Sequence, residues 1–271
     1  MKRDYKKQIV ITGASGLLGS YFYKKFKNRY KILKYPYRIE NIKKFEKWMF
    51  KKKFEYFIHF AALPKGNISE LNRINTKSTI DILKKLKKND FFKYFLFIST
   101  SHVYAYSRKS ILENGKVKPI NNYGLSKKKV EDFIIKNTRN FGFKIGIARI
   151  FNITGPKQRK GYFVPDMYRL INMEKYIDNI NCYRDFVHIE DVVESINILI
   201  KKKFNKIVNI SSGKKINLIK VCKTINAEFH KKKIVYGSRG GKDLFGNNAL
   251  LKSLGKKKFK NIKQIIKSFR K

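Results

Sequence analysis

Residues 8–26 read QIVITGASGLLGSYFYKKF and give the clearest indication of the fold. The first part of this stretch, QIVITG, is a short and continuously apolar run, which is typical of a strand buried on both faces of a sheet. Three glycines follow at once, and a helix is expected from Leu17 to about Lys27. The stretch therefore predicts a strand, a tight turn and a helix in immediate succession.

Strands and helices continue to alternate after this opening. Strands are expected at residues 30–35, 54–62, 93–100, 143–152 and 206–211, and helices at 39–53, 68–88, 123–137, 190–202 and 217–230. Such alternation indicates right-handed βαβ units. We therefore predict an α/β fold: a Rossmann-type doubly wound parallel sheet with a small C-terminal lobe. Residues 1–152 would form the Rossmann domain, with strands continuing to about residue 210, and residues 153–271 mainly the lobe, interleaved with the sheet.

The net charge is strongly positive. The 271 residues include 64 Lys and Arg but 19 Asp and Glu, which gives +45 at pH 7, whereas 42% hydrophobic residues exclude a disordered polycation. The lysine triplets are spread along the chain, at residues 51–53, 127–129, 201–203, 231–233 and 256–258. We therefore expect attraction of small anions and weak, non-specific nucleic-acid binding at most. The alternative is a basic nucleic-acid-binding protein that uses the same fold with a relic site.

Cysteine content and hydropathy indicate the cellular compartment. Cys182 and Cys222 are too few for a disulfide framework, and no apolar run is long enough for a signal peptide or a membrane span. Histidine and cysteine show no metal-ligand spacing. A soluble, cytoplasmic protein without a metal is expected, and a homodimer is left open.

The glycine turn predicts a function. In G-x-x-G-x-x-G, Gly13 makes the tight turn, Gly16 lets the backbone approach a pyrophosphate, and Gly19 allows close packing of helix and strand. A dinucleotide is therefore expected at the start of this helix. The second strand ends in KYPYR, which places Lys34 and Arg38 where an acid usually binds the ribose hydroxyls. A cation suits a 2′-phosphate, so NADP is favoured over NAD.

A tyrosine and a lysine form a second candidate motif. Tyr123 and Lys127, at i and i+4, share one helix face, and a neighbouring cation favours ionisation of a tyrosine hydroxyl. The same spacing occurs three more times, at Tyr21/Lys25, Tyr23/Lys27 and Tyr30/Lys34. Tyr123 differs because it follows a strand that ends in Ser99, Thr100 and Ser101, and ligands bind at that edge of a parallel sheet.

These motifs together resemble the extended short-chain dehydrogenases/reductases, the group of nucleotide-sugar epimerases, dehydratases and reductases. The similarity runs from about Ile9 to Gly255. It is carried, in order, by TGASGLLG, IHFAA (58–62), Asn75 in RINTKSTIDIL, STSHVY (99–104), YGLSK (123–127), ARIFNITGP (148–156), RDFVHIEDVV (184–193), VNISSG (208–213) and SRGGKD…LLKSLG (238–255).

The resemblance implies roles for individual residues. Tyr123 would be the general acid/base, Lys127 would lower the pKa of Tyr123 and hold the nicotinamide ribose, and Thr100 would orient the substrate oxygen. Cofactor contacts are implied for Gly13, Ser15, Gly16, Leu17, Leu18, Gly19, Arg38, Phe60, Ala61, Ala62, Asn75, Ser99, Tyr123, Lys127, Ile150 and Ile153. The positions that contact the sugar-nucleotide pyrophosphate correspond to Asn152, Arg184 and Arg239. For Arg184 the alternative is an ion pair with Asp185 or Asp191.

The resemblance also implies a reaction: NAD(P)-dependent hydride transfer at C4 of a nucleoside-diphosphate sugar. Ser101 and His102 stand where the family's dehydratases carry an Asp-Glu pair, so dehydration is not expected. RDFVHIEDVV favours an epimerase, whereas the missing acid after the second strand and the short chain favour a 4-keto-sugar reductase. Both stay open.

Overall fold

The computed structural model describes residues 7–270, which divide into two units. Unit 1 holds residues 7–104, 117–149 and 196–208, and unit 2 holds residues 105–116, 150–195 and 209–270. Two segments therefore cross the boundary expected at residue 152. Residues 105–116 join unit 2, and residues 196–208 return to unit 1.

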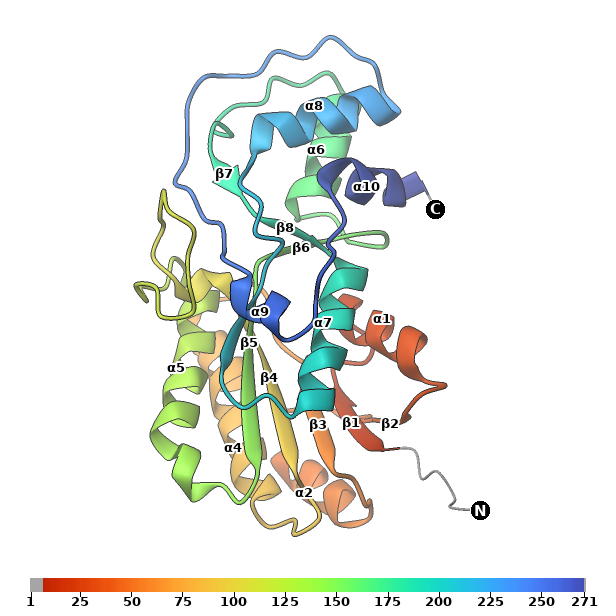
Figure 1. The fold of residues 1–271 in the computed structure, drawn as a ribbon, viewed down its shortest axis with the longest axis vertical. Coiled ribbons are helices and arrows are strands. Elements are labelled where there is room, and N and C mark those ends of the chain that lie inside the picture. The colour runs from red at the N-terminus through yellow and green to blue at the C-terminus, as the bar shows by residue number, and fades with distance from the viewer. Residues whose placement is uncertain (1–6, 271) are drawn as a thin grey trace. The chain divides into compact units, whose positions relative to one another are not determined.

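Unit 1 is built on the predicted sheet. Within residues 7–270 the sheet has six strands in the order β2-β1-β3-β4-β5-β9 (Figure 1). The strands are β1 (Gln8–Thr12), β2 (Lys31–Lys34), β3 (Tyr56–His59), β4 (Tyr94–Thr100), β5 (Lys144–Ile150) and β9 (Ile207–Ile210). β1 pairs in parallel with β2 on one side and β3 on the other. The chain thus reverses its direction of winding between β1 and β3, where doubly wound sheets bind ligands. The predicted fold class is confirmed.

Helices cover both faces of this sheet. The helices are α1 (Leu17–Phe26), α2 (Ile42–Phe50), α4 (Ser78–Leu86), α5 (Asn122–Asn137) and α7 (Ile189–Lys202). Apolar residues of α2, α4 and α5 form one buried cluster with the strands, as Phe45, Ile82 and Val130 do with Phe57. On the other face lie α1 and the C-terminal half of α7 (Figure 1). There the hydroxyl of Tyr30 donates to Asn197 Oδ1 at 2.6 Å.

The helix expected at 68–88 contains an unexpected widening. It consists of α3 (Ile68–Leu71), a π-helical segment η1 (Asn72–Lys77) and α4. Within η1, Thr76 Oγ1 donates to the carbonyl of Ser126 in α5 at 3.0 Å. π-Helical turns are rare and often mark functional sites, and this one turns Asn75 and Thr76 toward α5.

Three helices of unit 2 pack together around one apolar cluster (Figure 1). They are α6 (Phe163–Asn172), α8 (Leu218–Phe229) and α10 (Ile262–Lys267). Its strands β7 (Tyr183–Arg184) and β10 (Ile216–Asn217) pair antiparallel, and β6 (Asn152–Thr154) and β8 (Phe186–His188) pair in parallel. The sequence pattern indicates no helix between residues 151 and 190. This is wrong, because α6 lies there. Pro165 lies in the first turn of α6, a position that proline tolerates, and would have indicated the start of α6.

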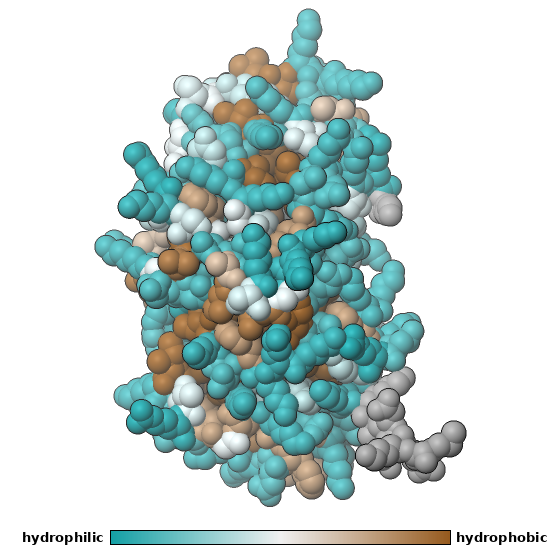
Figure 2. Space-filling model, in the orientation of Figure 1, coloured by the Kyte–Doolittle hydropathy of each residue, from teal (hydrophilic) through white to brown (hydrophobic). Residues whose placement is uncertain are grey.

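Hydrophilic side chains extend over the face shown in Figure 2, with small apolar areas between them. The lysine triplets belong to different parts of the chain, for example residues 51–53 after α2 and 231–233 after α8. Two members of the triplets, Lys127 and Lys256, are buried, so their charges depend on neighbouring groups.

A buried histidine links β1, β3 and α4. His59 is fully buried, with Nδ1 3.0 Å from Thr12 Oγ1 and Nε2 3.0 Å from Thr79 Oγ1. Thr79 donates its own proton to the carbonyl of Asn75 at 2.6 Å, and Thr12 accepts from the Ala61 N–H at 3.2 Å. Thr79 must therefore accept from Nε2–H, and the Nδ1 of a neutral ring then accepts from the Thr12 hydroxyl. The contacts fit a neutral imidazole.

Burial makes this histidine sensitive to acid. Desolvation lowers the pKa of His59 to about 3 from an ordinary 6.5. Between these values the unfolded chain takes up a proton that the folded chain refuses, so stability falls as the pH drops below about 6.5. We expect His59 to contribute a loss of up to about 1.4 kcal/mol per pH unit below that point.

Urea unfolding of the wild type and His59→Asn between pH 6.5 and 5 measures this loss. The wild type should show the steeper fall in the free energy of unfolding. Equal slopes in two folded proteins would show that His59 already carries a proton in the folded state.

Candidate active site

The glycine turn is closed by contacts that leave no room for side chains. Gly13 has a positive φ of 64°, and a Cβ there would lie 2.7 Å from the backbone nitrogen of Ala61. A Cβ on Gly19 would overlap the carbonyl oxygen of Gly13. Gly16 donates its N–H to that same oxygen at 3.0 Å. The turn thus presses the end of β1 against the segment after β3.

The turn presents the start of α1. Gly16 is the N-cap of α1, and within the described residues no side chain caps this helix end. The first N–H groups of a helix attract anions when no side chain satisfies them. Ser15 is exposed here, and Leu17 and Leu18 are half-buried. This geometry can hold a phosphate.

Asn75 braces the loop that faces the glycine turn. Its amide donates to the carbonyl of Leu63 at 2.9 Å, and its Oδ1 accepts from the N–H of Leu63 at 2.7 Å. The same amide also donates to Ser126 Oγ at 3.1 Å. Ser126 in turn donates to the carbonyl of Tyr123 at 2.8 Å. Asn75 therefore connects the loop containing Phe60–Ala62 to the helix that carries Tyr123.

The end of β4 is joined to the start of α5. Thr100 Oγ1 accepts from the N–H of His102 at 3.2 Å, and Gly124 packs so closely on the carbonyl of His102 that no Cβ would fit. Asn121 caps α5 through the Gly124 N–H at 2.8 Å and donates to His102 Nδ1 at 3.0 Å. These contacts bring the segment of Thr100 and the turn of Tyr123 to the same edge of the sheet.

Lys127 lies one turn further into α5 and is buried. Its ammonium group is 4.7 Å from the ring centre of Phe97 and 5.9 Å from that of Tyr123. Burial lowers the pKa of Lys127 to about 7, and the carboxylate of Glu131 opposes this shift. The charge of Lys127 at neutral pH thus depends on Glu131.

Glu131 and Arg149 form a buried ion pair that the sequence analysis did not predict. Arg149 Nη2 lies 2.6 Å from Glu131 Oε2, and its Nε lies 3.1 Å from Oε1. Ser99 Oγ donates to Glu131 Oε1 at 2.5 Å, and the guanidinium of Arg149 stacks 4.6 Å from the ring centre of Tyr104. The spacing Y-x-x-x-K-x-x-x-E was the available signal, since it places Glu131 on the helix face of Tyr123 and Lys127.

The other three Y-x-x-x-K matches have different surroundings. Lys34 lies in β2 with its ammonium 3.6 Å from the ring centre of Tyr23. Tyr30 is buried against Asn197, and Tyr21 and Tyr23 belong to α1. None of the three tyrosines follows the polar end of β4, so the sheet edge distinguishes Tyr123 from them.

Cations stand after β2, as predicted. Arg38 is exposed, and Lys34 lies over Tyr23. The next acid along the chain, Glu40, lies 3.5 Å from Arg73. The structure thus presents a cationic surface at the end of β2.

The residues expected to bind a sugar nucleotide belong to unit 2. Asn152 Nδ2 donates to the carbonyl of Asp185 at 2.9 Å. Arg239 is exposed and pairs with Asp178. Ile153 lies beside Asn152 in β6, and Ile150 is buried at the end of β5.

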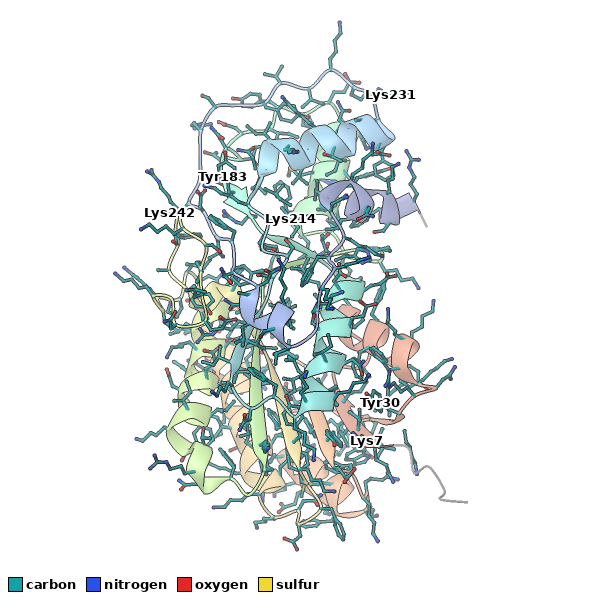
Figure 3. The ribbon with its side chains drawn as sticks, in the orientation of Figure 1. Lys7, Tyr30, Tyr183, Lys214, Lys231 and Lys242 are labelled. Carbon is teal, nitrogen blue, oxygen red and sulfur yellow. The ribbon has the colours of Figure 1, made fainter. Side chains whose placement is uncertain are left out.

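Arg184 is held by backbone carbonyls. Its Nη1 donates to the carbonyls of Lys242 at 2.5 Å and Tyr183 at 2.9 Å, two residues labelled in Figure 3. Asp185 instead accepts from Ser212 Oγ at 2.8 Å, and Asp191 pairs with Lys256. The alternative of an ion pair between Arg184 and Asp185 or Asp191 is therefore not found in the described structure.

Two other kinds of site, a membrane span and a metal centre, are not found in residues 7–270. No helix there is long and apolar enough to cross a membrane. No group of three His, Cys, Asp or Glu side chains there is placed to hold a metal ion.

Known proteins share this architecture. A UDP-glucose epimerase of Bacillus subtilis, itself uncharacterized, is 26% identical over 260 residues, which is 80% of this chain and 81% of that protein. dTDP-D-glucose 4,6-dehydratase of Dictyostelium discoideum is 26% identical over 274 residues, or 80% of this chain and 61% of the relative. The crystal structure of UDP-glucose 4-epimerase with UDP-glucose from Thermotoga maritima matches the fold with a TM-score of 0.83 at 22% identity. It covers 97% of this chain and 98% of that one.

The family comparison is the broadest of these findings. Residues 9–211 match the NAD dependent epimerase/dehydratase family. The match begins in β1 and ends just after β9, so it includes every strand of the six-stranded sheet described above. It also takes in well over half of the sequence, and this chain therefore belongs to the NAD dependent epimerase/dehydratase family.

Proposed function

We propose that the protein is an NAD(P)-dependent epimerase or 4-keto reductase that acts at C4 of a nucleoside-diphosphate sugar. The observation that carries this proposal is the junction of β4 and α5, where Thr100 and Tyr123 share one sheet edge above the buried Lys127. The names of an epimerase and a dehydratase of sugar nucleotides among the relatives support the substrate class.

The glycine turn is suited to the dinucleotide. The contacts that exclude side chains at Gly13 and Gly19 let a pyrophosphate approach the backbone, and the uncapped N–H groups in the first turn of α1 would bind it. When bound, the nicotinamide supplies or accepts a hydride. The loop of Phe60–Ala62 would line the adenosine side.

Tyr123 would move the proton. As the C4–H bond breaks with its electron pair, the C4 hydroxyl would lose its proton to the Tyr123 phenolate, and the C4 ketone would form. The ammonium of Lys127 would stabilise that phenolate, and the Thr100 hydroxyl would hold the C4 oxygen. Return of the hydride to the opposite face, with the proton from Tyr123, gives an epimer; a reductase performs the return step alone.

Glu131 would act through Lys127 as a positioning residue. Its carboxylate opposes the desolvation of the lysine, and Arg149 and Ser99 hold it in place. A buried carboxylate one turn below Lys127 therefore favours the cationic lysine that the proton step needs.

Unit 2 would supply substrate contacts from Asn152, Arg184 and Arg239. Guanidinium groups suit a pyrophosphate because they donate two parallel hydrogen bonds. Arg239 would exchange its exposed pair with Asp178 for the phosphate. Dehydration is not proposed, since Ser101 and His102 provide no carboxyl pair after Thr100.

Tyr123→Phe should lower turnover by about 10²–10⁴-fold, because the acid/base is lost while the glycine turn remains. Turnover is measured on a panel of UDP-, GDP- and dTDP-sugars and their 4-keto forms, with nicotinamide absorbance and product stereochemistry recorded. Tyr21→Phe and Tyr23→Phe are the controls and should be near neutral. Full activity in Tyr123→Phe would refute the assignment.

Glu131→Gln should move the basic limb of the pH–rate profile to lower pH. Lys127 loses its cationic form as the pH rises through about 7, and removal of the carboxylate lowers that pKa further. Asp132→Asn is the matched control, because Asp132 is the exposed neighbour that pairs with Lys128. An unchanged limb in folded Glu131→Gln would contradict the role, and Ser99→Ala, which keeps the ion pair, offers a milder test.

The protein should bind NADP(H) more tightly than NAD(H). Arg38→Ala should weaken NADP(H) by roughly tenfold or more, the equivalent of one charge-assisted hydrogen bond, and leave NAD(H) nearly unchanged. Isothermal titration measures both, with the exposed Arg139→Ala as a control for the loss of one charge. A preference for NAD(H) that Arg38→Ala does not alter would overturn the prediction.

A further inference from the structure

Unit 2 contains a hollow of about 540 Å³ outside the residues assigned above. Its wall comes from the first turns of α7, the segment after β9, α9 (Ala249–Ser253), the loop that follows α9, and α10. The residues that line it include three acids of α7 and six lysines from the other segments. The predicted cofactor, catalytic and substrate residues are not among them.

The carboxylates of this hollow are already paired. The buried Lys256 places its ammonium 2.8 Å from Asp191 Oδ1 and 2.8 Å from Glu194 Oε2. Lys260 pairs with Glu190, and its backbone N–H donates to Asp191 Oδ2 at 2.9 Å. Two lysines thus neutralise much of the negative charge and fix the loop after α9 against α7.

Four more lysines line the same hollow: Lys214, Lys252, Lys257 and Lys258. They are exposed, and in the described structure no ion pair forms at any of the four. They come from three places in the chain, after β9 (where Figure 3 labels Lys214), in α9 and in the loop after it. Like charges that converge on one hollow repel one another, and a multiply charged anion relieves that repulsion.

We propose that this hollow binds a small anion that carries two or more phosphate groups. Each ammonium is a compact charge with three donors, which suits phosphate oxygens. The volume falls in the range of small-molecule sites, roughly 300–1,000 Å³. The paired Lys256 holds Lys257 and Lys258 at the hollow in advance, so little ordering is needed on binding. The site is separate from the proposed catalytic function.

The chain supplies its own control for this proposal. Lys51, Lys52 and Lys53 form an exposed triplet in unit 1 that contributes nothing to the hollow. A triple alanine variant there removes the same charge as the variant of Lys252, Lys257 and Lys258. The two variants will differ in anion affinity only if the hollow itself binds the anion.

Isothermal titration of the full-length protein with inorganic tripolyphosphate, at a salt concentration of about 150 mM, makes the comparison. K252A/K257A/K258A should raise the Kd by roughly tenfold or more, as for the loss of a charge-assisted hydrogen bond, and K51A/K52A/K53A by less than about twofold. Equal losses, or no measurable binding to the wild type, would overturn the proposal.

Two further measurements separate the sources of binding. Tripolyphosphate should protect Lys214, Lys252, Lys257 and Lys258 of the wild type from acetylation, read by mass spectrometry, more than it protects residues 51–53. If Arg184→Ala rather than K252A/K257A/K258A abolishes binding, the anion occupies the proposed substrate site and this proposal fails. Turnover of a sugar nucleotide should be unchanged in K252A/K257A/K258A, so the proposed catalytic function is tested separately.

A single-stranded oligonucleotide tests the other source of phosphate. Its affinity should fall equally in K252A/K257A/K258A and in K51A/K52A/K53A, as expected for dispersed charge. If it binds more tightly than tripolyphosphate and loses affinity only in K252A/K257A/K258A, the hollow is a nucleic-acid contact and the small-anion proposal is wrong.

Discussion

The backbone of Gly13 lies against the backbone of Ala61 with no space for a side chain between them. This contact joins the end of β1 to the end of β3 at the point where the sheet changes its direction of winding. From there a continuous set of hydrogen bonds runs through Thr12, His59 and Thr79 to Asn75. Asn75 in turn holds Leu63 and Ser126, and Ser126 bonds the turn of Tyr123. The glycine turn and α5 are therefore parts of one hydrogen-bonded framework.

The buried charges of α5 depend on that framework. Lys127 has no full compensation for its burial, which is why its pKa falls to about 7. Glu131 is stabilised differently, by hydrogen bonds from Nε and Nη2 of Arg149 and from the Ser99 hydroxyl. A buried ion pair contributes little net stability because both ions lose their hydration. The main effect of this pair is to hold the negative charge of Glu131 near Lys127. The strand end that carries Ser99 and Thr100 is thereby joined to α5.

The cations of unit 2 differ in whether they have partners. Arg184 is satisfied by backbone carbonyls, Arg239 by Asp178, and Lys256 by two carboxylates. The lysines that remain around the hollow lack such partners in the described residues. The sequence does not show which of these cations are paired. A lysine with a partner is structural, and a lysine without one is a candidate contact for an anion.

The fold class can be predicted from the sequence, because continuous apolar strands alternating with amphipathic helices admit few arrangements other than a parallel doubly wound sheet. The sequence also determined the glycine turn, since only glycine tolerates the positive φ and close backbone contact at Gly13. The tertiary structure decided the rest. Four Y-x-x-x-K matches share one spacing, and the sequence distinguishes Tyr123 only by its place after the strand that ends in Thr100. The packing of Gly124 on His102 then brings the turn of Tyr123 to the end of β4. The π-helical turn at Asn75, the Glu131–Arg149 pair and the bond from Arg184 to the carbonyl of Lys242 join residues distant in sequence. Local periodicity carries no information about such contacts, because they depend on which elements pack together.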